Sequence, residues 1–234
     1  MRPVERGAAP KAYKDYNLAL NDLYERIGRG CSYCERKYSG AVEHMLPKGR
    51  HTGLATTWSN FLLACANCNS IKNKQQNAGV AGNAGAALGQ YLWPDTDNTA
   101  LAFDYSRGAI GVSAAVPAAL VNVAQATMVM TGFHRLPHTG NPPKSRKDLR
   151  WKERNEAWDL AERKALQLAS RPSPELRETI AELAAATGFW SVWRTVFAAD
   201  ADMLGRLNRE FKGTAPTCFD PTTFQAVQRQ GGQL

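Results

Sequence analysis

The residues of this chain with the most recognisable chemistry are four cysteines in two close pairs. Cys31-Ser-Tyr-Cys34 forms the first pair and Cys65-Ala-Asn-Cys68 forms the second. Each Cys-x-x-Cys turn can point two sulfur atoms at one ion, so the two pairs can close a tetrahedral shell around zinc. Because such a shell has no open position for water, the pattern predicts a structural zinc, and any catalysis must come from other residues.

Polar residues with catalytic potential lie in and just after the segment between the two pairs. Glu43 and His44 are adjacent, Asn60 lies farther along, and Asn69 directly follows the last cysteine. A neutral imidazole can accept a proton near neutral pH, and carboxylate and amide oxygens suit hard divalent cations. Plainer interpretations also exist, with Asn60 capping a turn and Asn69 capping a helix. His51 is a competing candidate for the base.

The order of these residues resembles the HNH endonuclease family. We expect two short strands and then a helix that begins at the second cysteine pair. This order, with His44, Asn60 and Asn69 in sequence, is similar to the ββα-metal finger of that family. The last histidine of the family's name is replaced here by asparagine. The resemblance covers residues 31–74 and depends on the coincidence of the cysteine pairs with the strings Glu-His-x-x-Pro-Lys and Cys-x-x-Cys-Asn-x-x-Lys.

The resemblance implies a role for each polar residue. His44 would be the general base that activates water for phosphodiester hydrolysis. Asn60 would hold the loop after His44 through a backbone hydrogen bond. Asn69 and Glu43 would supply oxygen ligands to a catalytic Mg²⁺ or Mn²⁺, although many relatives carry aspartate at the position of Glu43. The residues expected to contact nucleic-acid phosphates are basic and flank this centre: Lys48, Arg50, Lys72 and Lys74.

The elements that must position these residues follow from hydrophobic periodicity and turn residues. Apolar residues recur at helical spacing over residues 11–27, and Gly28 supplies a stop before the first cysteine pair. Residues 79–89 are rich in glycine, alanine and asparagine and predict a connection between ordered parts. Residues 101–113 predict a β-hairpin around Ser-Arg-Gly. A helix with Pro117 as its first residue should then run to Met130.

The chain after Trp151 is mostly helical by pattern. We expect helices over residues 151–169, from the N-cap Ser173 to about residue 186, and over residues 189–199, with a short one over residues 203–211. Aromatic and aliphatic side chains form a stripe on the third helix. At helical spacing, such a stripe is typical of a hydrophobic core.

These expectations define the fold class as α+β, mainly α. A zinc-stapled ββα-metal finger would be embedded in a largely helical protein with a small β-hairpin. The expected division is residues 1–78 for the N-terminal helix and nuclease finger, residues 79–150 for a connecting region with hairpin and helix, and residues 151–234 for a helical C-terminal region.

Composition and charge narrow the class of protein. Lysine and arginine number 29 against 21 aspartates and glutamates, and the sequence pI of about 9.4 favours polyanionic partners such as nucleic acid. No apolar run has transmembrane length and no signal peptide is apparent, so we expect a cytoplasmic protein without membrane contact. In a reducing compartment, paired cysteines indicate metal, and the fifth, Cys218, should be a semi-buried structural residue. One basic cluster fits either a solvated helix approach or a phosphate-binding strip: Lys144, Arg146, Lys147, Arg150, Lys152 and Arg154.

The tail of the chain carries a second, looser resemblance. The chain is similar to bacterial HNH nuclease subunits of Septu and retron-linked anti-phage systems. This similarity depends on the strings Glu-His-x-x-Pro-Lys and Trp-x-Asn-x-Leu-Leu together with the tail, which contains Thr187-Gly-Phe-Trp-Ser-Val-Trp-Arg, Phe211-Lys-Gly-Thr and Cys218-Phe-Asp. That resemblance implies a DNA-cutting defence effector, with an ATPase or other sensor subunit, or a second copy, docked on the helical part. Two alternatives remain: a non-catalytic zinc finger that binds nucleic acid or protein, and a nuclease that cleaves RNA.

Overall fold

A computed structural model describes residues 1–37, 40–78, 87–136 and 148–234, without the side chains of residues 75–78. The N-terminal helix is shorter than its periodicity predicts. A 3-10 turn, η1 (Tyr16–Ala19), leads into α1 (Leu20–Ile27), because the Asp15 side chain accepts a hydrogen bond from the backbone N–H of Asn17 and so caps the first turn. α1 ends as predicted at Gly28, whose φ of 75° favours glycine.

The predicted strand, strand, helix order follows. β1 (Ala41–His44) pairs antiparallel with β2 (Phe61–Ala64), with His44 opposite Phe61. The connection between them contains two 3-10 turns, η2 (Thr52–Leu54) and η3 (Trp58–Asn60). α2 (Ala66–Ala78) begins within the second cysteine pair. All four residues of β2 are buried, and Met45 and Trp58 near the two ends of the connection belong to the same hydrophobic cluster.

The middle of the chain forms the predicted hairpin and helix. β3 (Phe103–Ser106) and β4 (Ala109–Val112) pair antiparallel around the Arg107-Gly108 turn. A 3-10 turn, η4 (Ala118–Leu120), then leads into α4 (Val121–Thr131). Pro117 is the N-cap of that turn, with ψ of 140°, so its expected place as the first helical residue was wrong by one position. Residues 79–86 of the predicted connection lie outside the described residues.

The C-terminal part is helical, as predicted. α5 (Arg150–Ser170), α6 (Pro174–Thr187), α7 (Trp190–Val196) and α8 (Ala201–Glu210) follow in order, and a last 3-10 turn is η5 (Pro216–Cys218). The Ser173 hydroxyl accepts a hydrogen bond from Leu176 N at 3.0 Å, which confirms it as an N-cap. Cys218 in η5 is fully buried, rather than semi-buried, and burial raises the pKa of its thiol to about 11.

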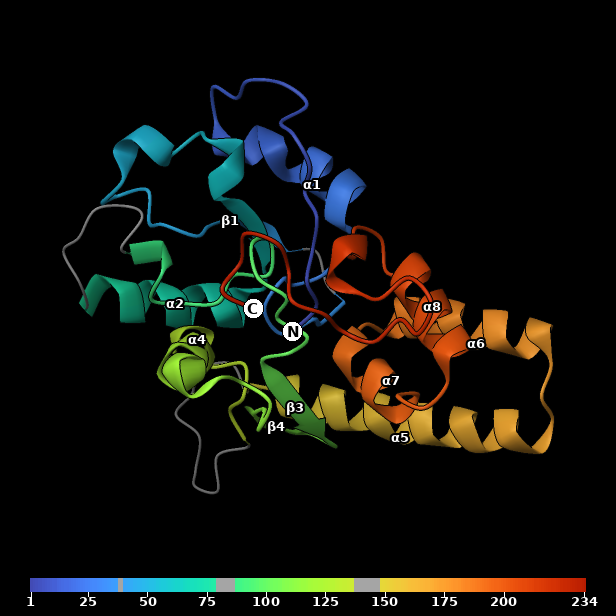
Figure 1. The fold of residues 1–234 in the computed structure, drawn as a ribbon. Coiled ribbons are helices and arrows are strands. Elements are labelled where there is room, and N and C mark those ends of the chain that lie inside the picture. Colours follow the sequence, from blue (N-terminus) through green and yellow to red (C-terminus); the bar gives the residue numbers. More distant parts are fainter. Residues whose placement is uncertain (38–39, 79–86, 137–147) are drawn as a thin grey trace.

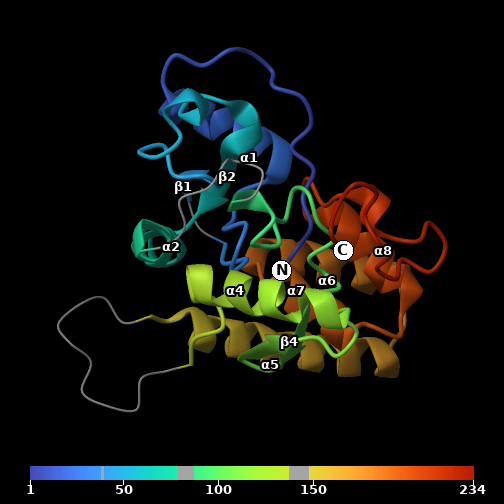
Figure 2. The same cartoon turned by 60° about the vertical axis from the view of Figure 1, so that its left-hand side comes forward.

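The finger and the helical part lie on opposite sides of the molecule (Figure 1). Both views show α2 beside α4 and α5 running alongside α7 (Figure 2). One hydrophobic cluster contains Leu23 of α1, Phe61 of β2, Phe103 of β3 and Val192 of α7, so the three expected regions share a core. The stripe on α7 is buried in this cluster and in a second one among α5 to α8, which confirms the core interpretation. None of the helices among the described residues is long and apolar enough to cross a bilayer.

Candidate active site and metal centre

The structure confirms that the four paired cysteines cluster. The Sγ atoms of Cys31, Cys34, Cys65 and Cys68 all lie within 4.8 Å of one another, and all four residues are buried. The Sγ atoms of Cys34 and Cys65 are 3.7 Å apart. A tetrahedron with Zn–S bonds of about 2.3 Å has edges of about 3.8 Å, so this spacing suits zinc. The donor set therefore fits one tetrahedral metal ion that staples the start of α2 to the turn before β1.

His44 ends β1 and is held in one orientation. Its Nε2 lies 2.9 Å from the carbonyl oxygen of Ala55. Because a carbonyl only accepts, Nε2 carries the proton and Nδ1 keeps its lone pair. The rings of Tyr16 and Phe61 contact the imidazole edge-to-face at centroid distances of 4.9 and 5.2 Å. Desolvation by burial lowers the pKa of His44 below its ordinary value of 6.5, which keeps a proton acceptor available at neutral pH.

Asn60 makes the backbone contact predicted for it. Its Oδ1 accepts a hydrogen bond from Leu46 N at 2.8 Å, and its Nδ2 donates to Leu46 O at 3.0 Å and to Leu54 O at 3.3 Å. The side chain is buried, so these bonds are shielded from water. Asn60 thus fixes the loop after His44 at both ends, and this loop includes the Ala55 carbonyl that orients the imidazole.

Glu43 of β1 and Lys72 of α2 form a buried ion pair. Lys72 Nζ lies 2.6 Å from Glu43 Oε1 and donates to His44 O at 2.6 Å. Lys72 is 1% exposed and Glu43 is 3% exposed. Desolvation raises the pKa of Glu43 and lowers that of Lys72, against their mutual attraction. The expectation that Lys72 contacts phosphate is therefore wrong, because its ammonium group is enclosed by the protein and locks β1 to α2.

A cleft of about 500 Å³ opens beside His44. Its walls come from η1, β1, the loop after β1 and α2, and its lining residues are Tyr16, Val42, Glu43, His44, Pro47, Lys48, Gly49, Arg50, Asn69 and Asn73. The cleft therefore brings the candidate base, the predicted oxygen donors and two of the predicted phosphate contacts to one place. Lys74 and His51 do not line it.

Asn73 and Tyr16 are lining residues with polar side chains that were not predicted from the sequence as part of the site. Asn73 donates through Nδ2 to Asn69 Oδ1 at 3.0 Å, so the two amides are neighbours on α2. The spacing of Asn69 and Asn73 could have predicted this, since residues four apart on a helix share a face. Tyr16 lies far from the finger in sequence, and its ring contacts His44 and carries Lys48 Nζ over its face at 3.9 Å from the centroid. Nothing in the local pattern indicates that contact.

The basic cluster at the start of α5 is not a phosphate-binding strip in its described part. Arg150 and Arg154 are buried and donate to backbone carbonyl groups of the last residue of α4 and of the turn after it, at 2.8 to 3.1 Å. Lys152 is exposed, and its Nζ lies 3.7 Å from Oε1 of Glu156. Lys144, Arg146 and Lys147 lie outside the described residues. The first turns of α5 therefore use arginine for internal packing.

Comparison with known proteins finds a matching family model for the finger. Residues 31–75 match the model of a protein family described as HNH endonuclease. No curated protein and no solved structure matches the chain. The matched segment covers both cysteine pairs, β1, β2 and most of α2, which are the elements that build the cleft. This part of the chain is therefore similar to HNH endonucleases, and that similarity supports a nuclease-type enzyme.

Proposed function

We propose that the protein is a metal-dependent endonuclease that hydrolyses phosphodiester bonds in DNA. The observation that carries the proposal is the state of His44 at the wall of the cleft. Its Nε2–H is bound to the Ala55 carbonyl, and burial keeps the ring neutral, so Nδ1 is a ready proton acceptor. A site that only bound nucleic acid would have no need of a buried base held in one tautomer.

The chain's own residues supply most of the proposed chemistry. His44 Nδ1 takes a proton from the attacking water. Asn60 holds the loop that orients His44 and so preserves the geometry of the attack. Lys48 and Arg50 are exposed, line the same cleft, and offset the negative charge of the phosphate.

A divalent cation completes the proposed site. Bound Mg²⁺ or Mn²⁺ would stabilise charge on the scissile phosphate and on the departing 3′ oxygen. Asn69 and Asn73 offer amide oxygens, and Glu43 offers a carboxylate on the same cleft, so the donor set fits a hard cation. Because Lys72 already contacts this carboxylate, Glu43 would share its charge between the ammonium group and the ion. The four-cysteine zinc is structural in this proposal.

The wider role proposed here depends only on the looser resemblance to anti-phage nuclease subunits. On that basis, the protein is the nuclease effector of a bacterial anti-phage system and acts in the cytoplasm. The surface of α5 to α8 would dock an ATPase or sensor subunit, or a second copy of the chain.

Cleavage of supercoiled plasmid by wild type and His44→Ala tests the proposed activity. Each protein is assayed with Mg²⁺, with Mn²⁺ and with EDTA, and single-stranded RNA is assayed in parallel. We expect metal-dependent nicking or linearisation by wild type and none by His44→Ala. His51→Ala is the matched control, because His51 does not line the cleft and should keep full activity.

The outcomes separate the alternatives. DNA left intact by wild type under every condition, but bound by it, would favour the non-catalytic zinc module. Cleavage of RNA in place of plasmid would overturn the assignment of DNA. Full activity of His44→Ala, or loss only in His51→Ala, would overturn the assignment of the base.

A further inference from the structure

A buried arginine from the helical region contacts one of the four cysteines of the proposed zinc site. Arg150, the first residue of α5, donates through Nη1 to Cys68 Sγ at 3.0 Å. The arginine is 1% exposed, so the contact is shielded from water. It joins residues 82 positions apart in sequence. The helical region thus reaches into the shell around the predicted metal.

The same guanidinium group also binds the end of α4. Nη1 donates to Thr131 O at 3.0 Å and Nη2 donates to Gly132 O at 2.8 Å. Gly132 ends α4 in the left-handed conformation, with φ of 58°, which favours glycine. Asp148 accepts from the same guanidinium group, from Nε at 2.9 Å through Oδ1 and from Nη2 at 2.6 Å through Oδ2. One side chain therefore joins a metal-ligand sulfur, the end of α4 and the start of α5.

Charge explains why an arginine is buried at this point. Four thiolates around one Zn²⁺ leave a net charge of about −2 in a site that excludes water. A burial cost of this kind falls when charged hydrogen-bond donors contact the sulfurs. Arg150 supplies such a donor to Cys68. Without the thiolate, the guanidinium group would lose part of the negative charge that balances it.

The first cysteine pair is held by the helical region as well. Arg36, two residues after Cys34, forms a bidentate ion pair with Glu153 of α5, with Nη2 to Oε1 at 2.8 Å. Glu35 accepts hydrogen bonds from Ser191 of α7 through N at 2.8 Å and Oγ at 2.6 Å. Contacts from α5 and α7 therefore reach both halves of the metal site.

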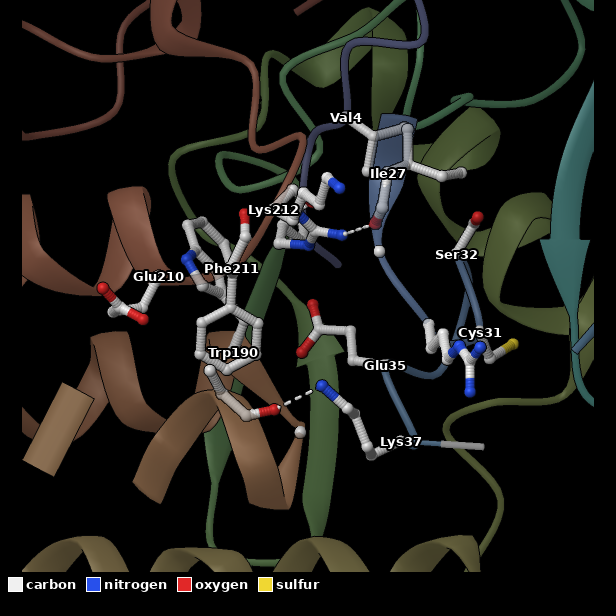
Figure 3. Close-up of a pocket in the computed structure, with 16 residues that line it drawn as sticks. Val4, Ile27, Cys31, Ser32, Glu35, Lys37, Trp190, Glu210, Phe211 and Lys212 are labelled. Atoms are coloured by element: carbon white, nitrogen blue, oxygen red, sulfur yellow. Dashed lines mark hydrogen bonds between the residues drawn. The ribbon is translucent and has the colours of Figure 1, made fainter. Parts of the chain in front are cut away.

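Figure 3 shows how closely the two parts approach beside the first pair. Cys31, Ser32 and Glu35 lie on one side of a cavity of about 80 Å³, and Trp190 and Phe211 lie on the other. Lys37 reaches across to donate to Ala185 O at 2.8 Å. A cavity this small leaves little room between the finger and the helices.

We propose that Arg150 is a positioning residue of the zinc centre, which stabilises the Cys68 thiolate and thereby couples metal binding to the docking of α5 on the finger. This inference rests on the proposed zinc site, but not on nuclease activity. It assigns the helical region a part in holding the metal, in addition to any role in binding a partner.

Arg150→Met and Arg154→Met test the proposal in the full-length protein. Arg154 is the matched control, because it is equally buried one turn along α5 and its Nε and Nη1 bind backbone carbonyls, not sulfur. Zinc affinity is measured by competition with a chromophoric chelator, and the thiolate-to-metal charge-transfer band is recorded with Co²⁺ in place of zinc. Hydrogen exchange of α5 is followed in the metal-loaded and metal-free proteins.

We expect Arg150→Met to lose about 10-fold to 100-fold in zinc affinity, the usual effect of removing a hydrogen bond to a ligand. Its cobalt band should shift, because the donor to Cys68 is gone. Arg150→Lys should recover part of the affinity, and Arg154→Met should keep the wild-type band and affinity. Metal removal from wild type should increase exchange at the start of α5.

The failures are distinguishable. A wild-type protein without a cobalt–thiolate band would overturn the zinc site and this inference with it, whatever the nuclease assay gives. A normal band in wild type that is unchanged in Arg150→Met, with unchanged zinc affinity, would overturn this inference alone. Equal losses of affinity in Arg150→Met and Arg154→Met would also overturn it, since general destabilisation would then be the cause. If Arg150→Met does not fold, Arg150→Gln takes its place, because it removes the positive charge but keeps a polar side chain; an unchanged band in that variant, with equal zinc affinity, would refute the role.

Discussion

Replacement of Lys72 by methionine should destabilise the fold by about 3–5 kcal/mol, the usual cost of removing one partner from a buried ion pair. Lys72 is 1% exposed and lies 2.6 Å from Glu43 Oε1. Methionine fills a similar volume but leaves the carboxylate without its partner and His44 O without its donor. Because domains are stable by only about 5–15 kcal/mol, this loss is a large fraction of the total.

Proton uptake by Glu43 limits the cost and gives it a pH dependence. A carboxyl group with an unfolded pKa of about 4.3 takes a proton at pH 7 at a cost of about 3.7 kcal/mol, at about 1.36 kcal/mol per unit. Burial raises the pKa of Glu43 in the folded protein. Since the folded variant then binds more protons than the unfolded chain, its stability relative to wild type should rise as the pH falls from 7 toward 5.5.

Urea unfolding in excess zinc, followed by far-ultraviolet circular dichroism, measures the change in free energy of unfolding. Lys74→Met is the matched control, because Lys74 is exposed on the same helix and its loss should change stability by less than about 0.5 kcal/mol. Glu43→Gln combined with Lys72→Met should recover much of the loss, since the stranded charge is removed. A loss below about 1 kcal/mol in Lys72→Met, together with weaker DNA binding, would refute the reasoning and restore Lys72 as a phosphate contact.

Three further predictions concern the finger. Asn60→Ala should lose about 2–4 kcal/mol of stability in the same urea assay. The buried N–H of Leu46 loses its acceptor, and the carbonyl groups of Leu46 and Leu54 lose a donor. A change below about 1 kcal/mol would contradict this expectation. As the pH falls, nuclease activity should decrease with a midpoint below the ordinary histidine pKa of about 6.5, because the lowered pKa keeps His44 neutral down to lower pH. A pH–rate profile with its acid midpoint above about 6.5 would argue against His44 as the base. Cys65→Ser should lose zinc and ordered structure together, as judged by metal analysis and circular dichroism, since metal-binding energy is also folding energy in such a module; a well-folded, metal-free variant would contradict a structural zinc.

The sequence predicted most of the finger because its signals are local. Each Cys-x-x-Cys turn brings two thiols together within four residues, and Gly28 and Ser173 act on backbone within a few residues. The hairpin at residues 103–112 was predicted for the same reason. Boundaries were less accurate. Residues 11–15 have helical periodicity, but Asp15 captures the N–H of Asn17 and the helix begins after it.

Only the tertiary structure decided which charged residues face solvent. In the sequence, nothing distinguishes the buried residues Lys72, Arg150 and Arg154 from the exposed residues Lys48 and Lys74, since all five are basic residues in polar surroundings. The buried three are enclosed by carboxylate, sulfur and carbonyl groups from segments far away in sequence. The contact of Tyr16 with His44 likewise depends on how η1 packs against β1. Residue type and spacing therefore determined which ligands and which base the chain could offer. Packing between segments far apart in sequence determined their solvation and thus their protonation, because the desolvation cost of a charge depends on every element that surrounds it.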